Sequence, residues 1–259
     1  MDLVYIVKKS EKNEDLRYSL RSVAKNVSFN NIWIVGYKPS WVTNVRYLPV
    51  TQSGTKWDNS VKNIIAACEC PLISDNFVLM NDDFFAIKPI DDIKKSVNVC
   101  LGSLEKAILK YEKSVSSWKK AFKYVYDLLK ELNIPGPYYN YESHTPLIIN
   151  KKKYLEVMSL PAVVKFRKTP KVLHKRSLYK NIDKIIPAVL PSDVKIHSKI
   201  DNTLKKIEIC DWLSVYDNQV DNWTFRDLNS LLHQMFPDPC QYEVVKEQTE
   251  KPKKDIFKF

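Results

Sequence analysis

Glycine is scarce in this sequence of 259 residues, which contains only Gly36, Gly54, Gly102 and Gly136. Average usage would give about eighteen glycines in a chain of this length. No two of the four have the spacing of GxGxxG or GxxxxGK[ST], the loops that hold phosphate in dinucleotide-binding and P-loop proteins. If the protein binds a nucleotide, it must hold the phosphates in another way.

Disulfide, export and membrane signals are also lacking. The five cysteines are odd in number and irregularly spaced, and Cys68 and Cys70 form a lone CxC without the second pair that a zinc site needs. The opening residues, MDLVYIVKKSEKNED, do not follow the order of a signal peptide. No apolar run approaches the length of about 18 residues that spans a membrane. We therefore expect a cytoplasmic protein without an integral membrane segment.

Positive charge is in excess. Lys and Arg total 41 against 30 Asp and Glu, for a formal net charge of +11. Such an excess favours anionic partners such as sugar nucleotides, nucleic acids or acidic lipid surfaces. The lysines are spread along the chain, however, so a lysine-rich proteome explains the charge equally well.

Strand and helix patterns alternate in the first hundred residues, which predicts an α/β fold with a largely parallel sheet. Short apolar runs rich in β-formers predict strands at 3–7, 32–35, 45–50 and 77–80. Apolar residues at helical spacing predict helices at 14–27 and from a cap at Asp58 or Asn59 to about residue 68. Further along, the patterns predict a strand at 146–149 and helices at 151–158, 179–186 and 224–236.

The region 101–136 has a different pattern. From Leu104 to Leu132 apolar residues recur every three or four positions, with lysines between them, which predicts an amphipathic helix or helix pair. We interpret this region as a solvated helical insertion. A basic surface for a polyanion is the alternative.

Asn81 and two adjacent carboxylates, Asp82 and Asp83, directly follow the predicted strand at 77–80. Ligands of open α/β sheets bind at the carboxyl ends of the strands, so the pair lies at the expected edge of a site. Carboxylates there suit Mg²⁺ or Mn²⁺ bridging a diphosphate, and such a metal would neutralise charge on the leaving phosphate. Because Asp pairs are also common in solvated turns, the pair alone leaves that alternative open.

Several blocks of the sequence occur in an order that resembles the Stealth family of sugar-phosphate transferases and related phage and bacterial glycosyltransferases. The blocks are DLVY (2–5), EDLRYSLRSV (14–23), NIWIV (31–35), NDDFF (81–85), YESHTP (141–146) and FPDPCQYE (236–243). Lys8, Lys9 and Ser10 stand where Stealth proteins have WVDGSD, and Cys240 replaces a serine. The smaller glycosyltransferase relatives therefore look closer than the capsule phosphotransferases.

This resemblance implies a GT-A-like fold, in which nucleotide-diphospho-sugars are bound, with a helical insertion. The implied organisation is an α/β nucleotide-sugar-binding part at 1–100, the insertion at 101–136, an acceptor-side part of the same domain at 137–245 and a charged tail at 246–259. It also implies a nucleotide-sugar donor and an acidic metal motif at Asp82 and Asp83.

His144 is the next candidate after the acidic pair. Its imidazole could ligate the metal, act as the base toward an acceptor hydroxyl or contact the leaving phosphate. A lone histidine is more often a structural residue, but the resemblance favours a functional one. His174 and His197 have weaker support, and His233 is expected to belong to a helix.

Cationic and aromatic residues complete the predicted site. Arg17 and Arg21 lie on one face of the helix after the first strand and could bind the donor diphosphate, or simply form a surface pair. Trp57 could stack on a base, with Lys56 or Asn59 on sugar or phosphate, although a core role for Trp57 is equally compatible. In the acceptor half the resemblance adds Arg167, Lys168, Asp193 and Lys195.

The sequence thus favours a metal-dependent glycosyltransferase, with Asp83 and His144 as catalytic residues and Asp82, Asp83 and His144 as metal ligands. One alternative is a Stealth-like transferase that releases a nucleoside monophosphate. Another is a DNA-modifying glycosyltransferase or a basic nucleic-acid-binding protein. The acceptor would be a glycan, a polysaccharide or DNA, and the oligomeric state is not predicted. GxSxG, HExxH and paired CxxC motifs are absent, so serine hydrolases, zincins and zinc ribbons lack support.

Overall fold

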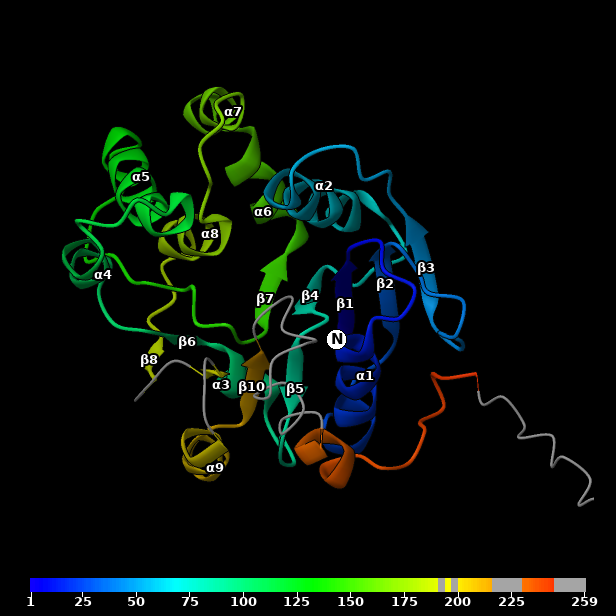
Figure 1. The fold of residues 1–259 in the computed structure, drawn as a ribbon. Helices are drawn as coiled ribbons and strands as arrows, with labels where there is room; N and C mark the ends of the chain where they lie inside the picture. Colours follow the sequence, from blue (N-terminus) through cyan, green and yellow to red (C-terminus); the bar gives the residue numbers. More distant parts are fainter. Residues whose placement is uncertain (191–193, 197–199, 216–229, 245–259) are drawn as a thin grey trace, which may run out of the picture.

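The computed structural model describes residues 1–190, 194–196, 200–215 and 230–244. A central sheet of five strands has the order β3-β2-β1-β4-β7 (Figure 1). Strands β1 to β4 are parallel, and β7 runs antiparallel to β4. Their bounds are β1 (Asp2–Val7), β2 (Ile32–Gly36), β3 (Arg46–Pro49), β4 (Asn76–Asn81) and β7 (Leu147–Asn150). The predicted α/β class with a largely parallel sheet is confirmed.

Helices cover both faces of this sheet. On one face α1 (Glu14–Asn26) buries Leu16, Leu20 and Val23 against alternate residues of β1 and β2. On the other face α2 (Lys56–Glu69) and α6 (Lys151–Ser159) pack on the remaining alternate residues. Because side chains of a strand alternate between faces, the continuous apolar strands of the sequence are explained by burial on both sides.

A helical group extends the second face, at the top and left of Figure 1. It comprises α4 (Leu104–Lys110), α5 (Ser117–Glu131), α7 (Pro161–Arg167) and α8 (Lys175–Asp183). The pattern in 101–136 therefore forms a helix pair. Helix α8 begins and ends earlier than the predicted 179–186, and α7 was not predicted.

Smaller elements complete the fold. A second sheet has the order β5-β10-β9, made of β5 (Phe84–Ala86), β10 (Trp212–Val215) and β9 (Lys195–Ile196). The others are α3 (Ile93–Val97), α9 (Ile200–Ile209) and the pair β6 (Val99–Cys100) with β8 (Ala188–Val189). Since β4 ends at Asn81 and β5 begins at Phe84, Asp82 and Asp83 form the turn that joins the two sheets.

The start of α2 differs from the prediction. Thr55 is its N-cap, and Asp58 occupies the third helical position, where it completes a capping box with Thr55. The predicted cap at Asp58 or Asn59 was wrong because both residues lie inside the first turn.

Two other predictions reach beyond the described residues. The helix predicted at 224–236 is present at residues 230–235, and residues 224–229 lie outside the described residues. The predicted charged tail at 246–259 also lies outside them. Of the helices that the structure describes, none is both long and apolar enough to cross a bilayer.

Candidate functional site

The carboxyl ends of the parallel strands form one edge of the central sheet. Asp82 and Asp83 follow β4 at this edge, and Leu79 pairs with Leu147 at the start of the antiparallel β7. The residues just before β7, including His144, therefore approach the same edge. The sheet thus places the acidic turn and the histidine loop on one side of the molecule, as expected for a ligand site.

The end of β2 at this edge is closely packed. Gly36 has a φ of +107°, and a Cβ atom there would lie 2.5 Å from the carbonyl oxygen of Val7 and 2.6 Å from Nε2 of Gln52. Gln52 Nε2 donates to that same carbonyl at 2.6 Å, and its Oε1 accepts from the backbone N–H of Lys9 at 3.1 Å. One of the four glycines is therefore required for the shape of the site edge rather than for phosphate binding.

Asp82 is held by the first helix. Asn13 is the N-cap of α1, where its Oδ1 accepts from the backbone N–H of Leu16 at 3.2 Å. Its Nδ2 donates to Oδ2 of Asp82 at 2.9 Å. One buried amide thus caps α1 and fixes the first carboxylate, at a left-handed φ of 26° that asparagine tolerates better than most residues.

Asp83 is held from the second sheet. Ser214 of β10 donates its hydroxyl to Oδ2 of Asp83 at 2.8 Å, and Nζ of Lys195 in β9 lies 3.7 Å from the same oxygen. The side chains of Asp83 and Lys195 are only 16 % and 12 % exposed. Lys195, which the resemblance placed in the acceptor half, therefore lies directly beside the acidic turn.

Arg176 of α8 secures the loop that carries His144. Its Nε donates to the carbonyl of Tyr141 at 3.1 Å, and its Nη2 donates to the carbonyl of Thr145. The buried guanidinium lies 5.8 Å from the ring centre of Phe84, which follows Asp83. Arg176 therefore joins the histidine loop to the acidic turn.

A carboxylate accompanies Arg176 in the interior. Burial opposes ionisation of Glu142, but the charges of His174, Arg176 and Lys175 outweigh it and hold its pKa below the ordinary value. Glu142 also accepts from the backbone N–H and hydroxyl of Ser177, at 3.2 and 3.0 Å. For Lys175, burial lowers the pKa to about 8 although Glu142 opposes the shift. Titratable groups shifted in this way are typical of functional sites.

His144 lies among aromatic rings. Its backbone has a left-handed φ of 53°, and its ring centre is 6.1 Å from that of Trp118, with the planes inclined by 24°. Trp118 also contacts His174, at 5.0 Å between ring centres. His174 is buried with neither ring nitrogen hydrogen-bonded to a described residue, and burial lowers its pKa. His174 is therefore a core residue, whereas His144 is partly accessible.

The acidic turn offers the oxygen ligands that hard divalent cations prefer. Within the described ranges, no group of three or more His, Cys, Asp or Glu side chains is arranged to hold a metal ion. Mg²⁺ is usually bound by one or two carboxylates together with substrate phosphates and water, so two aspartates fit a site that the donor completes. The metal-binding roles of Asp82, Asp83 and His144 stay predictions.

Arg17 and Arg21 face the carboxyl-terminal segment of the described chain. Arg21 donates from Nε and Nη2 to the two carboxylate oxygens of Glu243, at 2.6 and 2.9 Å, and Arg17 donates from Nη1 at 2.6 Å. The side chain of Glu243 is only 2 % exposed. The two arginines thus join two of the sequence blocks, 14–23 and 236–243, and their binding of a donor diphosphate stays a prediction.

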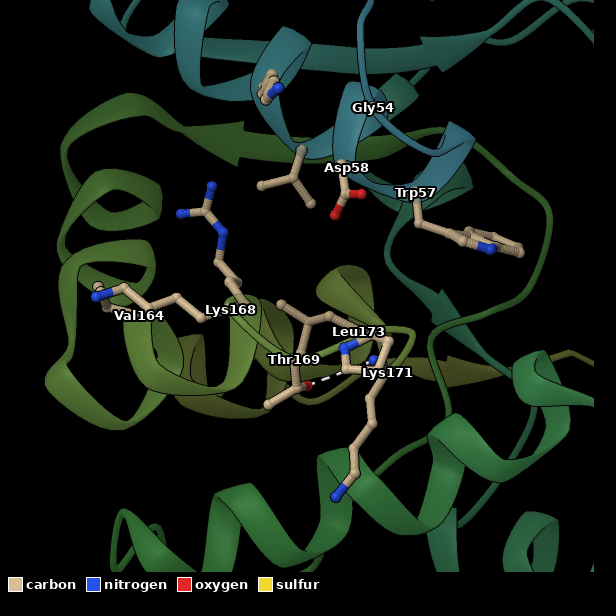
Figure 2. Close-up of a pocket in the computed structure, with 12 residues that line it drawn as sticks. Gly54, Trp57, Asp58, Val164, Lys168, Thr169, Lys171 and Leu173 are labelled. Carbon is tan, nitrogen blue, oxygen red and sulfur yellow. Dashed lines mark hydrogen bonds between the residues drawn. The ribbon is translucent and has the colours of Figure 1, made fainter.

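Lys56, Trp57 and Asn59 lie in the first turn of α2. Nζ of Lys56 is 4.9 Å from the ring centre of Trp57, and Asn59 exchanges two hydrogen bonds with the backbone of Gly54. Trp57 borders a cavity of about 660 Å³ between α2 and α7, which we call the α2–α7 cavity (Figure 2). Its walls are formed by Gly54, Trp57, Asp58, Val61, Lys62, Val164, Arg167, Lys168, Thr169, Pro170, Lys171 and Leu173. Predicted donor-side and acceptor-side residues thus meet in one cavity.

Sequence reasoning missed Asn13, Ser214 and Arg176. Asn13 carried a visible signal, since an Asn before the acidic Glu14 and Asp15 is typical of a helix cap. Ser214 and Arg176 had no signal, because their partners are distant in the sequence. Among the other candidates, His233 is exposed within the helical residues 230–235, while Asp193 and His197 lie outside the described residues.

Comparison with known proteins identifies the fold. No protein-family model and no curated protein matches the sequence. The structure of the galactosyltransferase LgtC in complex with donor and acceptor sugar analogues matches with a TM-score of 0.54 at 11 % identity, covering 95 % of this chain and 98 % of LgtC. A structure of an active-site mutant of LgtC matches with a TM-score of 0.54 at 10 % identity, covering 93 % and 98 %. The chain therefore has the GT-A-like fold that the resemblance implied.

Proposed function

We propose that this protein is a metal-dependent glycosyltransferase that moves a sugar from a nucleotide-sugar donor to a hydroxyl group of a glycan or polysaccharide. The observation that carries the proposal is the acidic turn. Asp82 and Asp83 lie at the carboxyl edge of a parallel sheet, and Asn13 and Ser214 fix one oxygen of each. The likeness in fold to LgtC, whose structure holds donor and acceptor sugar analogues, supports this proposal.

In this proposal Asp82 and Asp83 would hold Mn²⁺ or Mg²⁺ at the donor diphosphate. The metal supplies neutralisation of the charge that develops on the leaving phosphate. The acceptor oxygen forms a bond to the anomeric carbon as the bond from that carbon to the diphosphate oxygen breaks, and the nucleoside diphosphate leaves. His144 would take the proton of the acceptor hydroxyl; if it served as a metal ligand instead, the leaving diphosphate would take that proton.

Lys195 and Arg176 act on this site through charge and position. Nζ of Lys195 lies 3.7 Å from Asp83, so its positive charge reduces the repulsion between the carboxylates of the turn and the phosphates of the donor. Arg176 fixes the loop of His144 through two backbone carbonyls. Such supporting contacts are what keep reacting groups in place.

Product analysis tests the proposal. The protein is incubated with a panel of nucleotide sugars and Mn²⁺, with candidate oligosaccharides as acceptors, and the released nucleotide is identified. A nucleoside diphosphate supports glycosyl transfer, whereas a nucleoside monophosphate indicates the sugar-phosphate transfer of the Stealth alternative. A product formed only with a DNA acceptor would indicate the DNA-modifying alternative.

Matched variants tie the product to the site. Asp83→Asn should reduce nucleotide release, while Asp127→Asn, which changes a half-exposed aspartate paired with Lys123 on α5, should not. Release of neither nucleotide across a broad donor panel would contradict both transfer reactions.

A further inference from the structure

The α2–α7 cavity is strongly basic. Four of its lining residues are cationic, namely Lys62, Arg167, Lys168 and Lys171, and Asp58 is the single carboxylate among them. Asp58 accepts from the backbone N–H and the hydroxyl of Thr55, at 3.3 and 2.6 Å, and so is engaged in capping α2. The cavity therefore presents a net positive charge to whatever enters it.

None of these four cations forms an ion pair with a described residue, in contrast to Arg17, Arg21, Lys180 and Lys195. Nζ of Lys171 lies over the ring of Tyr124, at 4.9 Å from its centre, and Lys168 is exposed. Figure 2 shows Lys168 and Lys171 on the segment after α7, across from the first turn of α2 with Trp57 and Asp58; the side chain of Lys171 extends away from α2, toward Tyr124 of α5. Positive groups gathered around a concavity without ion-pair partners among the described residues are suited to an anionic ligand.

The cavity adjoins the candidate active site. Helix α2 follows β3 and precedes β4, so its first turn lies at the same carboxyl edge of the sheet as Asp82 and Asp83. The opposite wall, 168–173, runs directly into His174 and then Arg176, which holds the loop of His144. A molecule held in the cavity thus lies at the same edge of the sheet as the acidic turn.

The dimensions and lining select the class of occupant. A volume of about 660 Å³ falls in the range of small-molecule sites. Leu173 and the half-buried Trp57 add apolar surface of the kind on which the C–H face of a sugar ring packs. A nucleic-acid duplex would need a longer, open track of cations instead.

We infer that the α2–α7 cavity binds the acceptor through an anionic group on a sugar, a phosphate or a carboxylate. This inference rests on the proposed function, because it assigns the acceptor side of the same reaction. Arg167 and Lys168, with Lys62 and Lys171, hold the anionic group, and Trp57 packs against the sugar. The preferred acceptor is therefore a charged saccharide rather than a neutral one.

The test measures binding without donor or metal, so that it does not depend on turnover. A fluorescein-labelled disaccharide carrying one phosphate is titrated with the full chain in EDTA, at two salt concentrations, and its unphosphorylated match serves as the neutral probe. The phosphorylated probe should bind at least about tenfold more tightly, more weakly at high salt, and inorganic phosphate should compete with it.

Two double variants make the assignment specific. Lys168→Ala with Lys171→Ala should weaken binding of the phosphorylated probe by about tenfold, because each substitution removes one cation that pairs with the phosphate in a solvated ion pair. Lys165→Ala with Lys152→Ala, which changes lysines outside the cavity lining, should stay within about twofold. Circular dichroism checks that both variants are folded.

Equal binding of the two probes, or equal losses in the two double variants, would overturn the inference. Tighter binding of single-stranded or duplex DNA of matched charge, lost in the same cavity variant, would overturn the saccharide as occupant. Binding that depends on Lys168 and Lys171 in a protein that releases no nucleotide from any donor would support the cavity and contradict the proposed function.

Discussion

Two groups of cations that look alike in the sequence have opposite surroundings in the structure. Arg17 and Arg21 on α1 share the buried carboxylate of Glu243, whereas Arg167 and Lys168 beside the α2–α7 cavity have no acidic partner among the described residues. Arg176 belongs with the first group, since backbone carbonyls of Tyr141 and Thr145 accept its hydrogen bonds. Residue type therefore indicates only that a cation could bind phosphate. Its partners within the protein determine whether it stabilises the fold or is left to bind a ligand.

Removing the shared carboxylate tests the first group and should have the largest effect. Glu243→Ala removes the buried carboxylate that both arginines share, so we expect a loss of about 3 kcal/mol in the free energy of unfolding, measured by urea denaturation. Glu14→Ala, which removes the half-exposed partner of Arg17, should cost less than about 1 kcal/mol. Similar losses in the two variants would contradict the central role of Glu243.

Changing Arg176 tests whether a fixed cation can support catalysis by position alone. Arg176→Lys keeps the charge but loses the fork that reaches both carbonyls, so we expect kcat for nucleotide release to fall about 10- to 100-fold. The KM for the donor should change much less, because Arg176 acts through the His144 loop rather than on the donor.

The control for Arg176 is Arg46→Lys, which changes a guanidinium 5.4 Å from the ring centre of Trp33, away from the acidic turn. It should leave both kinetic constants near those of the unmodified protein. If kcat of Arg176→Lys falls only in proportion to the fraction of folded protein, the role of Arg176 is structural alone.

Low pH should selectively weaken the interactions of Arg17 and Arg21 with Glu243. Burial raises the pKa of Glu243, but hydrogen bonds from Arg21 and Arg17 outweigh it, so its pKa lies below the ordinary value in the folded protein. The stability that it contributes is complete above the unfolded value of about 4.3 and is lost as the pH falls through the folded value. Asp2 and Asp183 have lowered pKa values too and contribute in the same direction.

Urea denaturation over a pH series measures this loss of stability. The loss should be smaller than that caused by Glu243→Ala, because a protonated carboxyl group can still form hydrogen bonds. Glu243→Gln should show a shallower decline below pH 4.3 than the unmodified protein, since one lowered carboxyl no longer titrates. An identical decline in both proteins would show that Glu243 does not carry this pH dependence.

The cations of the cavity should have the smallest effect on stability. Lys168→Ala with Lys171→Ala removes solvated charges without internal ion pairs, so the free energy of unfolding should change by less than about 0.5 kcal/mol per site. The same urea measurement checks it. A loss comparable to that of Glu243→Ala would mean that these lysines stabilise the fold and that the two groups do not differ.

Local features of the sequence were predictable because they depend on neighbours in the chain. The buried run 77–80 followed by two aspartates gave the acidic turn, and the spacing of Arg17 and Arg21 placed them on one helical face. What could not be predicted depends on contacts across the chain. Asn13 is 69 residues from Asp82, Ser214 is 131 from Asp83, and Arg17 is 226 from Glu243. No periodicity or local spacing reports such pairs.

The same limit applies to the histidines and the cap of α2. His144 and His174 are both lone histidines in the sequence, and only the packing around Trp118 distinguishes the buried ring of His174 from the partly accessible ring of His144. Thr55 was missed as the cap because Asp58, a strong cap by type, lies three residues later and forms the other half of the capping box.

Metal-dependent binding of a nucleoside diphosphate tests the assignment of the acidic turn most directly. Isothermal titration calorimetry with uridine and guanosine diphosphates, with and without Mn²⁺, compares the unmodified protein with Asp82→Asn and Asp83→Asn. The account predicts that at least one diphosphate binds, that Mn²⁺ strengthens its binding, and that both variants lose the Mn²⁺-dependent part. Binding that ignores Mn²⁺, or that both variants retain in full, would contradict a donor site at Asp82 and Asp83.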